Sequence, residues 1–126
     1  MVDVGAGTGA LLSALRSAAP AARVVALDTS AGMLRIARTR RSAPAILADA
    51  LALPLADGIA DAVILAYVLF HLADPLVTLA EAARVLRPGG RAGTIGTSPG
   101  IGGLAWASSG SLAPSSLPFA SCAGCH

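Results

Sequence analysis

The chain has 126 residues, of which 55% are hydrophobic, 13% are charged and only 3% are aromatic. This length fits a single domain, and the apolar content excludes an intrinsically disordered chain. The charged fraction is about half of the roughly 25% that soluble domains carry. All nine basic residues are arginines, and the net charge is +2. That excess is too small for a basic face that neutralises several phosphates, so the composition argues against a charge-driven nucleic-acid binder.

The apolar runs of this sequence are too short to cross a membrane. A spanning helix needs roughly 20 consecutive apolar residues, whereas the longest run, from Ala62 to Phe70, is far shorter and directly follows Asp61. No basic segment followed by an apolar core opens the chain, so no signal peptide is visible. We therefore expect a protein that does not associate with membranes and that resides in the cytoplasm.

Short apolar runs alternate with helix-like stretches as far as about residue 96. The first strand, over residues 1–4, ends in a glycine-rich segment that leads into a helix over residues 10–18. The rest of this region follows the same alternation. Further strands are predicted over residues 23–27, 45–48, 62–65 and 91–96, and further helices begin after Ser30 and at Asp74-Pro75.

Two of the predicted helices begin with typical capping residues. Ser30 is a favoured N-cap, and Asp74 followed by Pro75 combines an N-cap with the residue that suits the first helical position. The helix after Asp74 has an apolar repeat that predicts its buried face: Leu76, Leu79, Ala80 and Ala83. Its polar residues are predicted to share the solvent-exposed face: Thr78, Glu81 and Arg84.

The predicted strands lack the alternation of polar and apolar residues that a half-exposed sheet has. Strands of this kind, separated by helices, indicate a parallel sheet covered on both faces. Right-handed crossover connections then give a doubly wound, Rossmann-like α/β fold with a mostly parallel sheet. We assign the five strands to one domain over residues 1–97.

The character of the chain changes after Arg91. Residues 92–126 contain no Asp, Glu, Lys or Arg and are rich in Ser, Gly, Ala and Pro. Beyond the fifth strand they have neither a helical nor a strand period, which is typical of a low-complexity segment. Residues 98–126 are therefore expected to form a disordered tail.

The segment from Val2 to Gly9 has glycines at positions 5, 7 and 9, where the first strand turns into a helix. Glycine lets the backbone approach a ligand closely and adopts positive φ without strain, and the helix N-terminus offers unpaired N–H groups. About 20 residues later, Asp28 ends the second strand, where a carboxylate can accept two ribose hydroxyls. This pattern alone also fits the fingerprint of an NAD-dependent oxidoreductase.

Asp49-Ala50, at the end of the third strand, separates these options because it can present a carboxylate and adjacent backbone groups to an adenine. With this addition, the sequence resembles the class I S-adenosylmethionine-dependent methyltransferases, specifically the small-molecule type called the methyltransferase 11 domain. The resemblance covers about residues 1–97. Its matching pieces, in the order that the family has, are residues 2–9, 28–34, 48–50, 61–63 with 69–72, and 86–90.

The resemblance implies cofactor-binding roles for nine residues. They are Asp3, Gly5, Gly7, Gly9, Asp28, Thr29, Asp49, Ala50 and Ala66. The three glycines would lie along the methionine part of the cofactor, and Asp3 would orient their loop and reach toward the amino acid moiety. Asp28 would hold the ribose hydroxyls. Asp49 and Ala50 would bind the adenine with Thr29 beside it, and Ala66 would close the methionine end.

The reaction that the resemblance implies asks little of the protein. Methyl transfer is an in-line displacement from a sulfonium, and its driving force resides in the cofactor. The protein mainly positions the methyl group and the acceptor, which is expected to be a small molecule. A general base is needed only where the acceptor must lose a proton early, and His71 and Tyr67 are the candidates. Because His71 lies in an apolar stretch, a packing role is its more common alternative. No metal site is expected.

Two departures from the family leave other functions open. Met1 falls inside the first strand and the closing antiparallel strands are missing, so we expect a core that is truncated at both ends. Residues 122–126 spell the C-x-x-C-H pattern of haem attachment, which we interpret as a chance occurrence because no second metal-binding pair accompanies it. The alternatives are an NAD-dependent oxidoreductase fragment, against which Asp49-Ala50 and residues 86–90 argue, and a catalytically silent remnant, which the missing strands favour.

Overall fold

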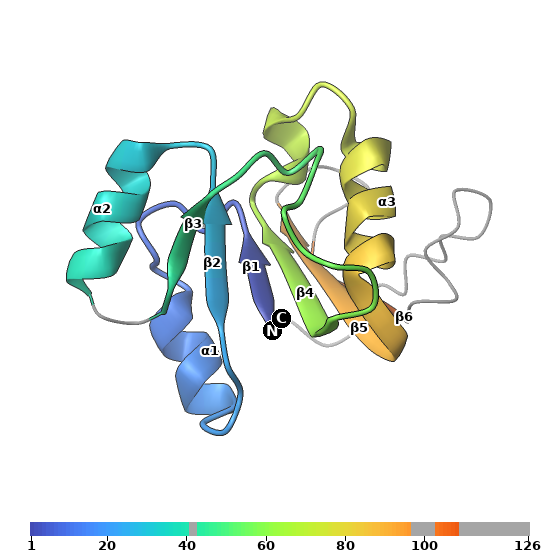
Figure 1. Cartoon of the computed structure of the whole chain (residues 1–126), viewed down its shortest axis with the longest axis horizontal. Coiled ribbons are helices and arrows are strands. Elements are labelled where there is room, and N and C mark those ends of the chain that lie inside the picture. The colour runs from blue at the N-terminus through green and yellow to red at the C-terminus, as the bar shows by residue number, and fades with distance from the viewer. Residues whose placement is uncertain (41–42, 97–102, 109–126) are drawn as a thin grey trace.

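The structure is a computed structural model, and it describes residues 1–40, 43–96 and 103–108. Strands and helices alternate along the chain (Figure 1). The strands are β1 (Val2–Val4), β2 (Val25–Asp28), β3 (Ala45–Leu47), β4 (Ala60–Ala66), β5 (Leu86–Gly96) and β6 (Gly103–Ser108). The helices are α1 (Leu12–Ala18), α2 (Ala31–Thr39) and α3 (Pro75–Val85), with a 3₁₀ turn, η1 (Leu69–His71), before α3. None of these described helices is long and apolar enough to cross a membrane.

One sheet organises the fold, with the strand order β3-β2-β1-β4-β5-β6. The pairs β1–β2, β1–β4, β2–β3 and β4–β5 are parallel. The strand order reverses between β1 and β4, and open α/β sheets bind their ligands in the crevice at such a switch point. The predicted Rossmann-like, doubly wound α/β fold with a mostly parallel sheet is confirmed.

Apolar residues cover both faces of the sheet. On one face, Val4 of β1 and Leu27 of β2 pack in a cluster that includes Ala82 of α3. On the opposite face, Ala26 of β2 packs with Leu12 of α1. Neighbouring residues of a strand point to opposite faces, so adjacent positions of β2 belong to different clusters. Burial on both sides explains why the strands lack polar alternation.

Both predicted helix caps are confirmed. The Oγ of Ser30 accepts the N–H of Met33 at 3.3 Å at the start of α2. The Oδ1 of Asp74 accepts the N–H of Leu76 at 3.1 Å, and Pro75 occupies the first turn of α3. Each cap satisfies an N–H group that has no partner inside the helix.

The face of α3 that meets the sheet differs from the predicted one. Its buried residues are Thr78, Ala82 and Val85, whereas Leu76 is 56% exposed. The prediction that Thr78 lies on the solvent-exposed face is therefore wrong. Small apolar residues occur around much of α3, so hydrophobicity barely distinguishes its sides. The sheet contacts the stripe of compact residues at positions i, i+4 and i+7.

A sixth strand corrects the predicted end of the fold. β6 pairs antiparallel with β5, from Gly96 opposite Gly103 to Arg91 opposite Ser108. The expectations that the closing strands are missing and that residues 98–126 are disordered are therefore wrong for residues 103–108. Strand pairing uses backbone N–H and C=O groups, so a segment without charge or clear period can still pair with the edge of β5. Residues 98–102 and 109–126, which include the C-x-x-C-H pattern, lie outside the described residues.

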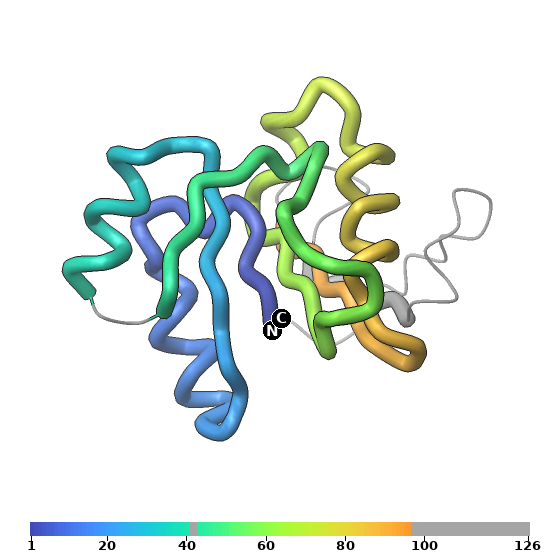
Figure 2. Tube along the Cα trace, in the orientation of Figure 1, coloured from blue at the N-terminus to red at the C-terminus, as the bar shows by residue number. Residues whose placement is uncertain are grey.

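The connection from β3 to β4 departs from the alternation of strands and helices. Residues 48–59 contain turns and an isolated bridge but no helix. Figure 2 shows this connection, in green, passing along α3 before it enters β4. A crossover helix would be stabilised by its own backbone hydrogen bonds. This connection instead depends on contacts with α3.

Candidate functional site

A small pocket of about 80 Å³ lies at the carboxyl edge of the sheet, where the parallel strands end. The segments that follow β1, β2, β3 and β4 all contribute to its wall. The lining residues include Gly5, Asp28, Thr29, Ala50, Val68 and Leu72. Pockets for whole small molecules have roughly 300–1,000 Å³, so this space takes only one end of a nucleotide-sized ligand.

A second, larger hollow of about 660 Å³ lies at the opposite, amino edge of the sheet, where α1 ends and β2 begins. Arg16, Arg23 and Pro44 are among the residues that line it. None of the site residues predicted from the sequence lines this hollow. Because open α/β sheets bind their ligands outside the carboxyl ends of the strands, we take the smaller pocket as the candidate site.

The glycines after β1 serve different purposes. Gly5, Gly7 and Gly9 have φ angles of 71°, 55° and 78°, a conformation that glycine adopts without strain. A Cβ at Gly5 would lie 2.6 Å from Cγ2 of Val68. A Cβ at Gly9 would lie 2.9 Å from Cδ1 of Leu12, whereas a Cβ at Gly7 would meet nothing within 4 Å. Gly5 and Gly9 thus permit close packing, and Gly7 has open space beside it.

Asp28, the last residue of β2, ties the glycine loop to this strand. Its Oδ2 accepts the N–H of Gly7 and its Oδ1 accepts the N–H of Ser30, both at 2.8 Å. A carboxylate has about four lone-pair sites, so both oxygens keep capacity for hydroxyl donors. Asp28 and the exposed Thr29 line the pocket, and the structure therefore brings these two predicted residues together at the candidate site.

Asp3 of β1 is buried two residues before the glycine loop. It is 1% exposed, and its Oδ2 has no hydrogen-bond partner among the described residues. Burial, helped by the nearby charge of Asp28, raises the pKa of Asp3 from 3.8 to about 6. A buried polar atom without a partner costs free energy, so this position favours a ligand that brings a hydrogen-bond donor or a positive charge.

Asp49 and Ala50 begin the connection from β3 to β4. The Oδ1 of Asp49 accepts the N–H of Leu51 at 2.9 Å, which closes a turn. Ala50 is 7% exposed and lines the pocket, whereas the exposed Asp49 is not among the lining residues. The structure thus places Ala50 in the pocket wall, and Asp49 directly precedes it in the chain.

The predicted residues after β4 do not line the pocket. Ala66 ends β4. Tyr67 is 52% exposed and has a φ of 56°, a strained conformation for a residue other than glycine. Its N–H donates to the carbonyl of Ile95 at 2.7 Å. His71 is exposed, and its ring lies 4.4 Å from that of Phe70, so it is not a core histidine.

Two apolar residues of the pocket wall are not among the predicted site residues. Val68 and Leu72 belong to the segment between β4 and α3, and Val68 brings this segment against Gly5. Their residue types do not distinguish them from ordinary core residues. Only their position shortly after a strand that borders the switch point could have indicated a place in the site.

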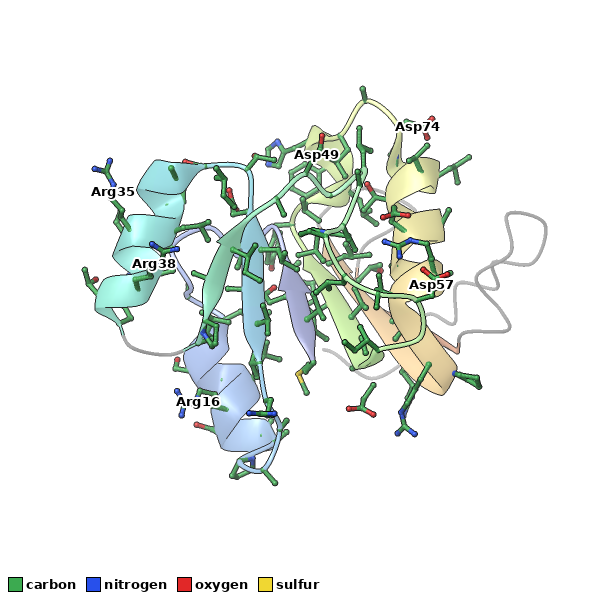
Figure 3. All side chains as sticks on the ribbon, in the orientation of Figure 1. Arg16, Arg35, Arg38, Asp49, Asp57 and Asp74 are labelled. Carbon is green, nitrogen blue, oxygen red and sulfur yellow. The ribbon has the colours of Figure 1, made fainter. Side chains whose placement is uncertain are left out.

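Charged residues of both signs lie toward the carboxyl edge of the sheet. Figure 3 shows Asp49 and Asp74 there together with Arg35 of α2, and Arg16 at the opposite edge. Among the described residues, no ion pair involves the four aspartates that lie toward the carboxyl edge, which are Asp3, Asp28, Asp49 and Asp74. Asp3 and Asp28 lie close enough to interact electrostatically, and two neighbouring carboxyl groups favour a cationic ligand.

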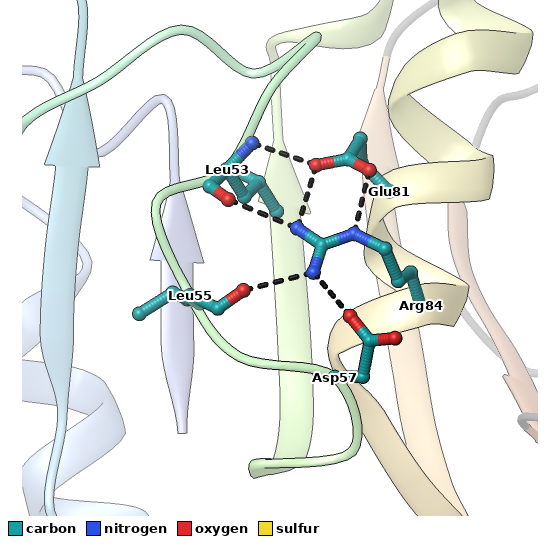
Figure 4. A network of polar contacts seen from close by, with 5 residues as sticks. All are labelled: Leu53, Leu55, Asp57, Glu81 and Arg84. Carbon is teal, nitrogen blue, oxygen red and sulfur yellow. Dashed lines mark hydrogen bonds and ion pairs between the residues drawn. The ribbon is translucent and has the colours of Figure 1, made fainter.

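A polar network joins α3 to the connection between β3 and β4 (Figure 4). Arg84 donates to both oxygens of Glu81, at 2.7 Å from Nε and 2.8 Å from Nη2. It also donates to Oδ1 of Asp57 at 2.6 Å and to the carbonyls of Leu55 and Leu53 at 2.8 and 2.9 Å. Its hydrogen bond and charge hold the pKa of Glu81 below the ordinary 4.5. From the sequence, Glu81 and Arg84 are predicted only as exposed helix residues, although Glu and Arg at i and i+3 are a known signal for pairing.

Fold and site together define a class of protein. The strand order, the glycine loop after β1 and the acid at the end of β2 are features of Rossmann-like proteins that bind adenosine-containing cofactors. The Oδ2 of Asp3, which has no partner among the described residues, and the open space at Gly7 fit a cofactor that also has an amino acid moiety with an ammonium group. Within the described part of the chain, no group of three or more His, Cys, Asp or Glu could hold a metal ion.

Comparison with known families makes the assignment specific. The family model for the methyltransferase domain, type 11, matches residues 2–93. The chain belongs to this family of S-adenosylmethionine-dependent methyltransferases, and the predicted resemblance is confirmed.

Several named proteins are similar to this chain over most of its length. The chain is 44% identical over 96 residues to a demethylmenaquinone methyltransferase from Thermus thermophilus, covering 72% of this chain and 44% of the relative. It is 42% identical over 94 residues to a malonyl-[acyl-carrier protein] O-methyltransferase from Hahella chejuensis, covering 72% and 34%. A solved S-adenosylmethionine-dependent methyltransferase from Thermotoga maritima has a TM-score of 0.65 and 29% identity, covering 74% and 42%. The chain therefore spans less than half the length of these relatives.

Proposed function

We propose that the protein transfers a methyl group from S-adenosylmethionine to a small-molecule acceptor by in-line displacement. The observation that carries this proposal is Asp3, whose buried Oδ2 has no hydrogen-bond donor among the described residues and lies two residues before a loop of left-handed glycines. A charge-assisted hydrogen bond from an ammonium group would satisfy this oxygen. The neighbouring carboxyl groups of Asp3 and Asp28 support the same choice, because the cofactor also carries a positive sulfonium.

In this proposal, the residues at the carboxyl edge each bind a different part of the cofactor. Asp3 accepts from the ammonium group, directly or through water. Asp28 accepts from the ribose hydroxyls, and its pocket, shared with Ala50, takes the adenine end. The remaining proposed contacts are Gly5, Gly7 and Gly9 along the methionine part, Thr29 and Asp49 at the adenine, and Ala66 at the methionine end. When bound, the cofactor supplies the activated methyl group.

The acceptor is proposed to bind beside the segment that follows β4. Tyr67 and His71 are exposed there, and we propose His71, with Tyr67 as the second candidate, as the general base for an acceptor that must lose a proton. The Thermus relative is named for demethylmenaquinone and the Hahella relative for a malonyl group on acyl-carrier protein. Their names support a small-molecule acceptor for this chain, either free or attached to a carrier.

Thermal unfolding with S-adenosylmethionine, with its demethylated product S-adenosylhomocysteine and with NAD tests the cofactor assignment. A ligand at 100 times its dissociation constant stabilises a protein by ~2.7 kcal/mol. We expect a shift with the first two compounds and none with NAD. A shift with NAD alone would support the oxidoreductase alternative, and no shift with any of the three would support the catalytically silent remnant.

Two glycine variants make this test specific for the glycine loop. Gly7→Ala is expected to abolish the shift, because its Cβ enters the open space beside the loop that the proposal gives to the cofactor. Gly89→Ala is the matched control, since Gly89 also has positive φ and open surroundings but lies near the start of β5, at the amino edge. It is expected to keep the full shift.

A further inference from the structure

The connection between β3 and β4 has no helix of its own, and α3 fixes its conformation. An arginine side chain has five N–H donors in a planar fork. Arg84 donates five hydrogen bonds: two to Glu81, one to Asp57, one to the carbonyl of Leu55 and one to the carbonyl of Leu53. All five donors of the guanidinium group are thus hydrogen-bonded, and their partners include three residues of the connection. A lysine carries its donors on a single nitrogen and cannot reproduce this arrangement.

Glu81 completes the attachment at one residue of the connection. Its Oε2 accepts the N–H of Leu53 at 2.7 Å, while Nη2 of Arg84 donates to the carbonyl of the same residue at 2.9 Å. The side chain of Leu53 is buried in the core, at 5% exposure. Leu53 is therefore fixed through both of its backbone polar groups and through its side chain (Figure 4).

A tight turn links Leu53 to the pocket wall. The N–H of Ala52 donates to the carbonyl of Asp49 at 3.1 Å, and the N–H of Leu51 donates to the Asp49 side chain at 2.9 Å. Ala50, within this turn, is buried and lines the pocket. Because the turn is so short, a displacement of Leu53 must also displace Ala50.

We propose that Glu81 and Arg84 are positioning residues that set the adenine-recognition segment, in which Ala50 lines the pocket and Asp49 directly precedes it. The proposal rests on the proposed function, which assigns the adenine to this segment. Neither side chain lines the pocket, so both act through the backbone of Leu53. Recognition of a purine edge depends on donors and acceptors in register, and a misplacement of about 1 Å can cost about 100-fold.

Arg87 provides a contrast at the beginning of β5. It pairs with Asp61 of β4 at 2.5 Å, and the two side chains are 58% and 69% exposed. Exposed pairs of this kind contribute little, and this one joins β5 to β4 rather than to the pocket wall. Arg87→Lys is therefore a matched control for Arg84→Lys, with the same chemical change three residues away.

The test measures ligand preference by isothermal titration calorimetry. The two ligands are S-adenosylhomocysteine and S-inosylhomocysteine, which replaces the adenine amino group by a carbonyl and so reverses the donor and acceptor pattern of that edge. The wild-type chain is expected to prefer the adenosyl compound. Arg84→Lys is expected to lose at least about tenfold in affinity for that compound and most of its preference. Arg87→Lys is expected to retain both.

Glu81→Gln serves as a second variant if Arg84→Lys does not fold. It keeps an oxygen for the N–H of Leu53 but loses the charged contact with Arg84, so we expect a smaller loss of preference. Wild-type preference in a folded Arg84→Lys or Glu81→Gln, even with a lower unfolding temperature, overturns the positioning role alone. A wild-type chain that binds neither ligand overturns the proposed function and this inference together.

Discussion

At the amino edge of the sheet, Arg84 and Arg87 are paired with carboxylates, whereas at the carboxyl edge Asp3 and Asp28 form no ion pair with a described residue. The contacts of Arg84 hold the connection from β3 to β4 in place, whereas the Arg87–Asp61 pair is exposed. At the carboxyl edge the charged form of Asp3 is instead unfavourable, because of its burial and the nearby charge of Asp28. Unfavourable interactions of this kind are typical of binding sites, where a bound ligand offsets them.

Glycines with positive φ at the two edges also differ, in how closely their surroundings pack against them. Gly89, at the amino edge, has a φ of 78° and open space where a Cβ would be. Gly5, at the carboxyl edge, has a φ of 71° and Val68 directly against it. Positive φ is thus combined with close packing at Gly5, beside the pocket, but not at Gly89.

Among the substitutions that test this comparison of the two edges, Gly5→Ala is expected to change the unfolding free energy most. Its Cβ would lie 2.6 and 2.8 Å from two atoms of Val68. A left-handed alanine and the overpacking together should cost about 2–5 kcal/mol of unfolding free energy. Gly89→Ala, with a similar φ and no neighbour within 4 Å, should cost only about 1–2 kcal/mol. Urea unfolding of both variants compares them, and equal losses would contradict the crowding that distinguishes the carboxyl edge.

Asp3 gives the carboxyl edge a distinct dependence of stability on pH. Its pKa is raised from 3.8 to about 6 by burial and by Asp28, so the folded state favours the neutral carboxyl. Its contribution to stability is complete below pH 3.8 and is lost as the pH rises through about 6. The difference between the two pKa values corresponds to ~3 kcal/mol.

Asp3→Asn removes this titration, and the two proteins share the titrations of all other groups. Between pH 4 and pH 7, the wild-type chain should therefore lose ~2.4 kcal/mol of unfolding free energy relative to the variant. Urea unfolding at a series of pH values measures this difference. A difference that stays constant with pH would mean that Asp3 is not held in its neutral form by the fold.

The smallest effect is expected at the amino edge, from Asp61→Asn. The substitution removes the charge that pairs with Arg87, but both side chains are more than half exposed. Exposed pairs of this kind contribute about 0–1 kcal/mol, and less in high salt. Urea unfolding at low and high salt should therefore barely distinguish the variant from the wild-type chain. A larger loss would show that this pair, too, is a structural attachment of the amino edge.

The features that the sequence predicts correctly are those with short-range causes. Ser30 and Asp74 cap the helices that follow them because each carries an acceptor one turn before the first unpaired N–H groups. The parallel pairing of β1 to β5 follows from apolar strands separated by helices. Positive φ at positions 5, 7 and 9 follows from the glycines themselves. The locations of Asp28, Thr29 and Ala50 in the pocket follow from their positions at strand ends.

The features that the sequence does not predict depend on contacts between distant segments. Thr78 is buried because the sheet contacts the side of α3 that bears it, a choice that local hydrophobicity does not determine. β6 forms because β5 offers an unpaired backbone edge, whatever the composition of the approaching segment. Arg84 binds carbonyls about 30 positions away in the sequence, and carbonyls carry no residue signature.

The contact between Val68 and Gly5 has a mechanical consequence for the two halves of the site. Val68 directly follows Tyr67, whose backbone is hydrogen-bonded to β5, and a Cβ at Gly5 would overlap the Val68 side chain. The glycine loop therefore cannot shift toward this segment without moving the stretch that bears Tyr67 and His71. Two loops in such close contact make the binding of successive ligands interdependent. The position of the glycine loop is therefore coupled to that of the segment that follows β4.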